Sequence, residues 1–418
     1  MPSLTRPHRP IQIAALSLVL AVASGCGLQQ VRSQAQTVES TGQIVGTVTT
    51  PAGMRGDTVV VVLRKSEGLD FLVQSATFAS TDGRFNFSIP PGEYYVASFR
   101  DLNADSRYQE GEPGKFHGEP TAISLPANGR VEISIDVPAG TEPLLAGKAD
   151  IAEVKAIVRN IGRVTTLEDE RFSRENASLG LWRPLEFLAG PEGGLFMLQE
   201  YDARRMPVIF VHGMGGTPLD FSAAIEALDR SKYQPWVLYY PSGLRLDMVS
   251  DYLVTAVRGL EKRYAERPFV VVAHSMGGLV TRSFVQKYAA RHADAASALR
   301  MVVTVNSPLG GMPSAASGVA HSPIVVPAWN DVATGSEFVT SLATDPWPAG
   351  LPWHLVFSYA GGDSDDGTVS LDSQIPLDLQ AQATRLHGFK GTHTGTLGDP
   401  AFLALLDKLL AEAVARQD

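Results

Sequence analysis

Cysteine is almost absent from this sequence, because Cys26 is the only one among 418 residues. A single cysteine cannot form an internal disulfide, which excludes a disulfide-stabilised framework. Long apolar runs are scarce as well, and the run at residues 11–23 is shorter than the roughly 20 residues that span a bilayer as a helix. The chain has no conspicuous block of Lys and Arg and carries a formal net charge of −9, so we do not expect nucleic acid as a partner.

The N-terminal segment has the layout of a secretory signal peptide. Arg6, His8 and Arg9 precede the apolar run, and the small residues Ala-Ser-Gly lead into Cys26. A cysteine at the cleavage point resembles the signal of bacterial lipoproteins, although Ala23 stands where that motif usually has Leu. The resemblance implies that residues 1–25 are removed, that the Cys26 thiol is lipidated, and that the protein is anchored to a membrane of a bacterial cell envelope.

Two changes in composition divide the chain that follows. Residues 26–41 are rich in Gln, Ser and Thr and are expected to form a flexible tether. Residues 42–138 contain short strand-like runs separated by turn residues, which predicts a small all-β sandwich. The runs are 43–49, 58–63, 84–89, 94–100 and 131–137. The stretch 83–100, with a Pro-Pro-Gly turn followed by Glu-Tyr-Tyr-Val, resembles the carboxypeptidase regulatory and transthyretin-like sandwiches.

Residues 139–206 have helical periodicity in two places and are expected to form a helical linker and lead-in. From residue 207 to 418, apolar strands alternate with amphipathic helices, which predicts an α/β domain with a doubly wound, mainly parallel sheet. The strands are 208–211, 236–240, 269–273, 301–305 and 355–359, and the helices include 244–264, 277–290 and 400–415. Residues 308–352 exceed a normal loop, and we expect them to form either a cap over a site or a surface excursion with its own small core.

A candidate nucleophile stands between a predicted strand and a predicted helix. The apolar strand 269–273 is followed by His-Ser-Met-Gly-Gly at 274–278, so Ser275 lies at the centre of an Ala-x-Ser-x-Gly pattern. A strand, a sharp turn that bears Ser, and a helix form the nucleophile elbow of serine hydrolases. Because that turn is strained, the residues around it must be small, which Gly277 satisfies.

Four segments between residues 178 and 415 together carry a family resemblance. They read Pro-Val-Ile-Phe-Val-His-Gly at 207–213, Gln-Pro-Trp at 234–236 with Tyr-Pro-Ser-Gly at 240–243, Ala-His-Ser-Met-Gly-Gly at 273–278 and Asn-Ser-Pro-Leu-Gly-Gly at 306–311. This set resembles bacterial triacylglycerol lipases and PGAP1-like hydrolases. The resemblance implies an α/β-hydrolase fold and the hydrolysis of lipid or other carboxylic esters, with no metal or other cofactor required for catalysis.

The resemblance also implies roles for individual residues. It places the base in the loop before the last helix, which selects His393 over His292, His321, His354 and His387. It places the acid in an Asp-Gly-x-Val segment after the strand 355–359, which selects Asp366 over its neighbours Asp363 and Asp365. The backbone N–H groups of Met214 and Met276 would then form the oxyanion hole beside Ser275.

A second candidate site lies in the predicted sandwich. Asp101, Asn103, Asp105 and Glu112 fall at positions 1, 3, 5 and 12 of a loop, as the oxygen ligands of an EF-hand do. Position 6 is Ser106 where that loop has Gly, and no helices flank the segment. These two departures favour a solvated acidic turn, and the spacing leaves a Ca²⁺ site as the alternative.

Two other functions remain open at this stage. An acyltransferase would use the same three residues and hand the acyl group to an alcohol or amine instead of water. A non-catalytic binding or scaffold protein of the envelope could be built on the same fold, although the presence of Ser275, Asp366 and His393 argues against it.

Overall fold

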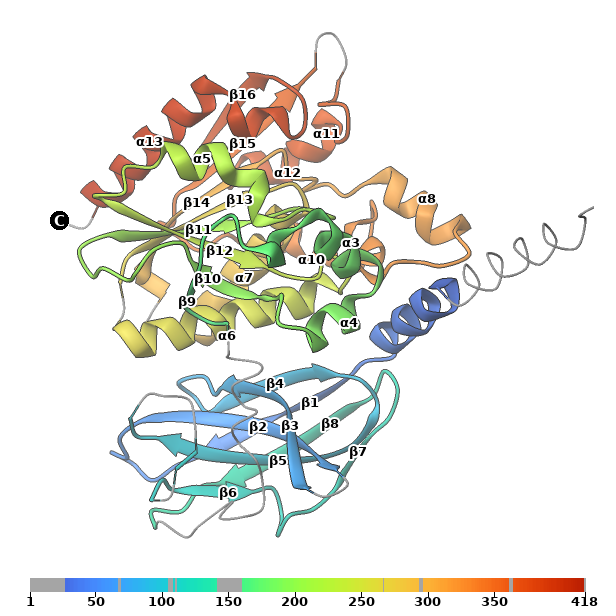
Figure 1. Ribbon diagram of the computed structural model, residues 1–418, viewed down its shortest axis with the longest axis vertical. Coiled ribbons are helices and arrows are strands. Elements are labelled where there is room, and N and C mark those ends of the chain that lie inside the picture. Colours follow the sequence, from blue (N-terminus) through green and yellow to red (C-terminus); the bar gives the residue numbers. More distant parts are fainter. Residues whose placement is uncertain are drawn as a thin grey trace, which may run out of the picture.

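The computed structural model describes residues 27–66, 69–103, 108–109, 111–140, 160–265, 267–292, 296–360 and 364–416. Within these residues the strands form three sheets, one of eight strands and two smaller ones that precede it in the chain (Figure 1). The predicted signal segment and Cys26 lie outside the described residues. In the described part of the chain, no helix is long and apolar enough to cross a membrane.

The two N-terminal sheets have the orders β4-β1-β8 and β3-β2-β5-β6, and β7 pairs with β5. Their strands are β1 (Gly42–Thr49), β2 (Asp57–Ser66), β3 (Leu69–Phe78), β4 (Arg84–Ile89), β5 (Gly92–Asp101), β6 (Gly114–Phe116), β7 (Ile123–Leu125) and β8 (Arg130–Asp136). The run of valines in β2 shows how the sheets pack. Val60 and Val62 join a core that also contains Ile44 of β1, whereas Val59 and Val61 face the opposite side, because successive side chains of a strand alternate.

The eight-stranded sheet has the order β16-β15-β14-β13-β11-β12-β10-β9. Its strands are β9 (Arg163–Val164), β10 (Gly194–Met197), β11 (Met206–Val211), β12 (Tyr233–Tyr239), β13 (Phe269–His274), β14 (Leu299–Val305), β15 (Trp353–Tyr359) and β16 (Arg385–Lys390). All pairs from β12 to β16 are parallel, while β10 pairs with β12 in the antiparallel sense. The chain is therefore a mixed α/β protein with a mainly parallel sheet, as the sequence predicts.

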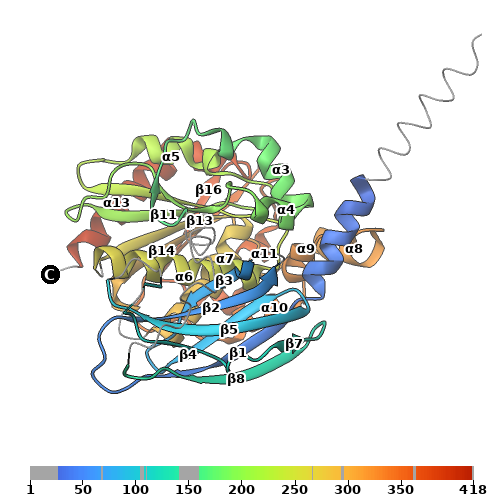
Figure 2. The same ribbon diagram turned by 60° about the horizontal axis from the view of Figure 1, so that its bottom comes forward.

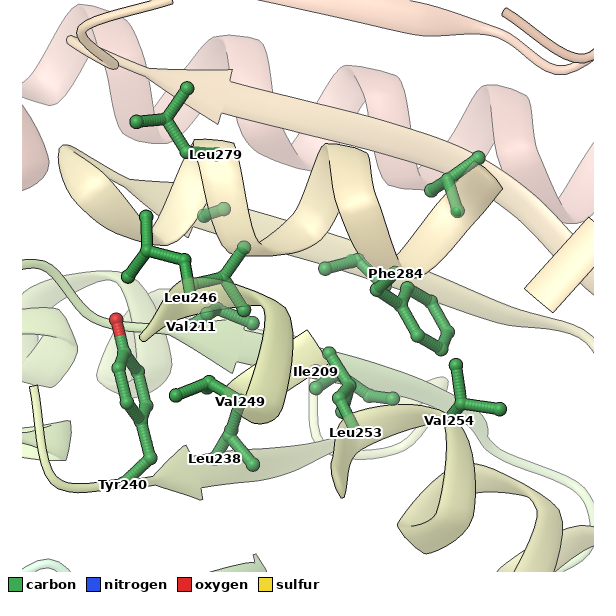
Figure 3. Close-up of a cluster of buried hydrophobic side chains, with 14 of the residues drawn as sticks. Ile209, Val211, Leu238, Tyr240, Leu246, Val249, Leu253, Val254, Leu279 and Phe284 are labelled. Carbon is green, nitrogen blue, oxygen red and sulfur yellow. The ribbon is translucent and has the colours of Figure 1, made fainter. Parts of the chain in front are cut away.

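Helices cover both faces of this sheet. They are α3 (Arg174–Trp182), α4 (Pro184–Ala189), α5 (Ser222–Ala227), α6 (Leu246–Tyr264), α7 (Met276–Arg291), α11 (Leu371–Gln374), α12 (Leu377–Gln380) and α13 (Pro400–Ala415), with α8 to α10 in the insertion described below. In β11, Ile209 and Val211 pack with side chains of α6 and α7 (Figure 3). Val208 and Phe210 point to the other face, where α5 and α13 contribute to the core. Burial on both faces explains the uninterrupted apolar strands.

The boundary expected at residue 207 is wrong, because the sheet begins earlier in the chain. Strand β10 lies in the segment expected to be a helical linker, and its Leu195, Phe196 and Met197 are fully buried against β12. Strand β9 and helices α3 and α4 belong to the same unit, which starts no later than residue 160. Part of the expected linker, residues 141–159, lies outside the described residues.

The segment expected to be a flexible tether contains a docked helix over residues 27–39 (Figures 1 and 2). Val38 is fully buried in the core beneath α6. The Gln34 side chain accepts hydrogen bonds from the backbone N–H groups of Leu185 and Glu186 at the start of α4, at 3.0 and 3.3 Å. Val31, Ala35 and Val38 have helical spacing, and this short apolar stripe is hidden by the polar composition around it.

The long insertion between β14 and β15 contains α8 (Pro313–His321), α9 (Pro327–Val332) and α10 (Glu337–Thr344). Helices α9 and α10 contribute Ala328, Val332, Val339 and Leu342 to the core beneath α6 and α7. Helix α8 has no buried residue. The insertion is therefore firmly packed at its centre and end, and α8 is its exposed part.

Candidate active site

Ser275 occupies a strained turn between β13 and α7. Its φ of 54° and ψ of −131° lie in a region that non-glycine residues rarely adopt. The backbone of neighbouring segments approaches so closely that a Cβ on Gly277 would lie 2.3 Å from the carbonyl oxygen of Val211. Small residues are thus required on the C-terminal side of Ser275, and the turn presents the hydroxyl at the end of the strand.

The structure brings Ser275, His393 and Asp366 together although they are far apart in the sequence. The Ser275 hydroxyl is 2.9 Å from Nε2 of His393, and Nδ1 of His393 is 2.7 Å from Oδ2 of Asp366. Ser275 follows β13, Asp366 follows β15 and His393 follows β16, so the three residues lie at the carboxyl ends of parallel strands. This edge is where ligands bind in open α/β sheets.

Backbone groups hold the second oxygen of Asp366. Its Oδ1 accepts hydrogen bonds from the N–H groups of Thr368 and Val369, at 2.9 and 2.7 Å. Gly367 lies between Asp366 and Thr368 with a φ of +90°, which permits this tight turn. Burial by itself would raise the pKa of Asp366, but the hydrogen bonds from His393 and Val369 outweigh burial and lower it. The carboxylate is therefore ionised and oriented toward the imidazole.

The neighbouring acid has a different role. Oδ1 of Asp365 accepts a hydrogen bond from the Gly367 N–H at 2.8 Å, so this carboxylate stabilises the turn itself. Asp363 lies outside the described residues.

Two of the other candidate bases, His354 and His387, contact each other on the adjacent strands β15 and β16. Nδ1 of His354 is 3.1 Å from Nε2 of His387.

Two residues that the sequence analysis did not single out fix the backbone of His393. Nε2 of His274 and Nδ2 of Asn306 donate hydrogen bonds to the His393 carbonyl oxygen, at 2.9 and 2.8 Å. Burial lowers the pKa of His274 to about 4, so the ring is neutral at pH 7 and its Nε2 carries the proton. The available signal was position, because His274 directly precedes Ser275 and Asn306 directly follows β14.

The loop after β11 lies against the serine. A Cβ on Gly213 would approach the Ser275 Cβ to 2.7 Å, so only glycine allows this proximity. The next residue is Met214, and the loop is held by a 2.9 Å hydrogen bond from the Gly215 N–H to Oγ of Ser242. Met276 is the first residue of α7 and is buried. The two predicted oxyanion-hole segments thus flank Ser275.

The buried side chain of His212 holds this loop in place. The ring is buried, stacks on Tyr240 with centroids 4.2 Å apart, and donates from Nδ1 to the Gly213 carbonyl oxygen at 2.8 Å. Burial lowers the pKa of His212 to about 4, so it is neutral at pH 7. The Tyr240 hydroxyl donates to the His212 carbonyl oxygen at 2.6 Å. His212 therefore has a structural role in holding the loop after β11, which explains why a histidine lies beside the site without contacting Ser275.

The expected Ca²⁺ ligands are only partly described. Asp105 lies outside the described residues, and the two carboxylate oxygens of Glu112 accept from the backbone N–H groups of Leu102 and Gln109, at 2.8 and 2.9 Å. In the described ranges, no group of three or more His, Cys, Asp and Glu side chains could hold a metal ion. Binding of Ca²⁺ by Asp101, Asn103, Asp105 and Glu112 stays a prediction.

A cavity of about 1100 Å³ lies between the N-terminal sheets and α6. Arg84 and Asn86 of β4 line one side, and Asp247 and Tyr252 of α6 line the other. Ser275 is not among its lining residues, so this cavity is separate from the candidate active site.

Comparison with known proteins gives distant matches only. No family model and no curated protein matches the chain. Among solved structures, the chain is similar to a mature lipase from Bacillus licheniformis, with 18% identity over 50% of this chain and 94% of that chain and a TM-score of 0.40. It is also similar to lipase B of Aspergillus fumigatus, with 18% identity over 52% and 55% of the chains and a TM-score of 0.40. A metagenomic carboxyl esterase matches with 15% identity over 51% and 77% and a TM-score of 0.39. Likeness at this level carries no inference about activity, so the assignment below rests on the geometry of the site.

Proposed function

We propose that this protein is a serine hydrolase of the α/β-hydrolase type that cleaves carboxylic esters through an acyl-enzyme. The observation that carries the proposal is the continuous set of hydrogen bonds from Ser275 through His393 to Asp366, with Ser275 on a strained turn at the end of a parallel strand. A nucleophile, a base and a residue that orients the base are the components of a catalytic triad.

The geometry supports a two-step reaction. Oγ of Ser275 attacks the ester carbonyl carbon while Nε2 of His393 accepts the hydroxyl proton. The imidazolium then donates that proton to the leaving alcohol, which departs and leaves the acyl group on Ser275. In the second step water attacks the acyl-enzyme while His393 accepts a proton from the water. The imidazolium returns that proton to Oγ of Ser275 as the bond to the acyl group breaks and the carboxylic acid leaves.

Asp366 and the backbone complete the proposed mechanism. Because Asp366 accepts from Nδ1, the neutral His393 keeps its proton on that nitrogen and leaves Nε2 free to act as the base. We assign the N–H groups of Met214 and Met276 to the oxyanion hole, where two donors stabilise the negative charge of the tetrahedral intermediate. The position of their segments on either side of Ser275 supports this assignment.

The remaining assignments concern the rest of the chain. We infer that Cys26 is lipidated, that the substrate is a lipid ester of the cell envelope, and that the two N-terminal sheets form a β-sandwich of the carboxypeptidase regulatory or transthyretin-like type. The core shared by Ile44, Val60 and Phe87 from both sheets supports the sandwich. Its separation from Ser275 favours a spacing or binding role over a catalytic one.

Labelling of Ser275 tests the catalytic proposal. A fluorophosphonate probe should label the native protein and leave the Ser275→Ala variant unlabelled. Hydrolysis of a panel of p-nitrophenyl esters of increasing chain length should then fall by several orders of magnitude in the same variant, on the order of 10⁶ by analogy with serine proteases. Labelling that persists in the variant would refute the assignment. Transfer of the acyl group to an added alcohol in preference to water would identify an acyltransferase.

A further inference from the structure

The N-terminal helix of residues 27–39 lies near α4 and α8 on one side of the molecule (Figures 1 and 2). Nη2 of Arg32 donates a hydrogen bond to the Pro323 carbonyl oxygen in the segment that follows α8, at 3.3 Å. Together with the bonds of Gln34 to the start of α4, this contact fixes the helix to two separate parts of the catalytic unit. These two attachments therefore fix the orientation of the N-terminal helix relative to the eight-stranded sheet and its helices.

The segment that Arg32 contacts contains no charged residues of its own. Residues 301–330 contain no Asp, Glu, Lys or Arg, although charged residues make up 19% of the chain. Much of this stretch is at the surface, because α8 has no buried residue, Pro323 is exposed, and Ile324 and Val325 are half-buried. A run of this kind at the surface of an acidic protein needs a physical explanation.

Large apolar side chains add to the same region. Leu28, in the first turn of the helix, is 61% exposed, and Trp182, the last residue of α3, is 40% exposed. The Trp182 ring lies edge-on to Trp329 with centroids 6.1 Å apart, and a Cβ on Gly318 of α8 would touch the same Trp329 ring at 3.0 Å. We call this surface the anchor face and define it as Leu28, Trp182, α8 and residues 322–325.

The anchor face adjoins the candidate active site. Leu181, next to Trp182, lies 3.7 Å from the position of a Cβ on Gly215, in the loop that carries Met214. Helix α8 begins shortly after the carboxyl end of β14, and Ser275 stands at the carboxyl end of the adjacent strand β13. A ligand held at this face would thus be close to the loop that carries Met214.

We propose that the anchor face lies on the surface of a phospholipid membrane and that the ester substrate reaches Ser275 from that membrane. The proposal rests on the inferred lipidation of Cys26, which directly precedes the helix. With no spacer between the lipid and a docked helix, the surface around Leu28 is held at the bilayer. The absence of charged residues from α8 and residues 322–325 then limits the cost of dehydrating ions, and exposed Leu and Trp side chains gain by insertion at the interface.

Vesicle binding without the lipid tests this proposal. The mature chain carrying Cys26→Ser would be mixed with vesicles of phosphatidylethanolamine and phosphatidylglycerol, and the bound fraction measured by co-sedimentation. We expect weak binding that falls about tenfold in both Leu28→Asp and Ile324→Asp, because each change places a charge where apolar surface would be buried. Hydrolysis of p-nitrophenyl acetate, which needs no membrane, should be unchanged in both.

Val414→Asp is the matched control. Val414 is 37% exposed in the last turn of α13, near the C-terminus, which both views show on the opposite side from the N-terminal helix (Figures 1 and 2). Equal loss of binding in this variant, or no loss in Leu28→Asp and Ile324→Asp, would overturn the proposal. If the protein is instead a dimer that dissociates in Leu28→Asp and Ile324→Asp, the anchor face binds a second copy of this chain and not a membrane. If p-nitrophenyl acetate is not hydrolysed by any variant while the binding pattern holds, the proposed function fails and the anchor face stands.

Discussion

Arg245 and Asp331 join the insertion to the segment that supports the loop after β11. Nε and Nη2 of Arg245 donate to Oδ1 of Asp331 at 2.9 and 2.6 Å, and the N–H of Leu246 donates to its other oxygen at 2.6 Å. Three residues earlier in α9, the Ala328 N–H donates to the Gly243 carbonyl oxygen at 3.2 Å, next to Ser242. A single buried carboxylate thus holds α9, the start of α6 and the neighbourhood of Ser242 together.

We therefore expect Asp331→Ala to lower the free energy of unfolding by about 2 kcal/mol. Breaking a fully buried pair costs about 3–5 kcal/mol, and the value here is smaller because Arg245 is 37% exposed and can be solvated. Urea denaturation measures the change. Asp229→Ala, which removes an exposed pair with Lys232, should change stability by less than about 0.5 kcal/mol. Equal effects of the two substitutions would show that Asp331 is not a structural link.

Asp366→Asn should abolish most turnover, whereas Asp365→Asn should stay within a few-fold of the native protein. Loss of the carboxylate that accepts from Nδ1 permits the wrong tautomer of His393, which costs about 10⁴ in turnover in a serine protease. Asp365 contacts the Gly367 N–H and not the imidazole. The rates of p-nitrophenyl ester hydrolysis decide the point, and a reversed order would assign the orienting role to Asp365.

Asn306 should act as a positioning residue for the base. Its φ is 50°, a conformation that glycine adopts readily. Asn306→Gly therefore removes the donor to the His393 carbonyl oxygen without straining the backbone. We expect kcat to fall about tenfold with KM unchanged, because the base is displaced and the binding surface is not. The rate of fluorophosphonate labelling should fall in parallel. An unchanged kcat, or a change confined to KM, would contradict this role.

Acidification should destabilise the protein between about pH 6.5 and pH 4. His212 and His274 have a pKa of about 4 in the folded state because they are buried, against an ordinary value near 6.5. In this window the unfolded chain binds more protons than the folded chain, so stability falls as pH falls. Each histidine contributes up to about 3 kcal/mol across the window. Chemical denaturation at pH 7 and pH 5 measures the decrease in the free energy of unfolding, and we expect this decrease to be smaller in His274→Gln. His321→Gln, at an exposed position, should not change it.

Much of the α/β unit could be predicted because its signals are local. The apolar strands at β11, β13 and β14 and the helices α6, α7 and α13 lie within a few residues of their expected bounds. Ser275 was identifiable because its turn imposes small neighbours within a single short segment. The choice of Asp366 and His393 depended on a family resemblance. No local sequence pattern indicates which acid and which histidine come together from the ends of different strands.

The elements that were missed depend on partners distant in the sequence. Strand β10 has only four residues, and its assignment depends on pairing with β12 about 40 residues later. The helix of residues 27–39 has only four apolar side chains, Leu28, Val31, Ala35 and Val38, and Gln34 fixes it by binding the backbone of α4. Asn306 and His274 became identifiable as supports only once the carbonyl oxygen of His393 was placed between them.

The backbone conformation of Ser275 has a consequence for how the protein could be altered. A residue held in a sparsely populated region costs about 1–3 kcal/mol, and glycine would adopt the same angles without that cost. The inactive Ser275→Gly variant should accordingly melt at a higher temperature than the native protein. The size of that increase would measure the free energy that the strained turn stores at Ser275.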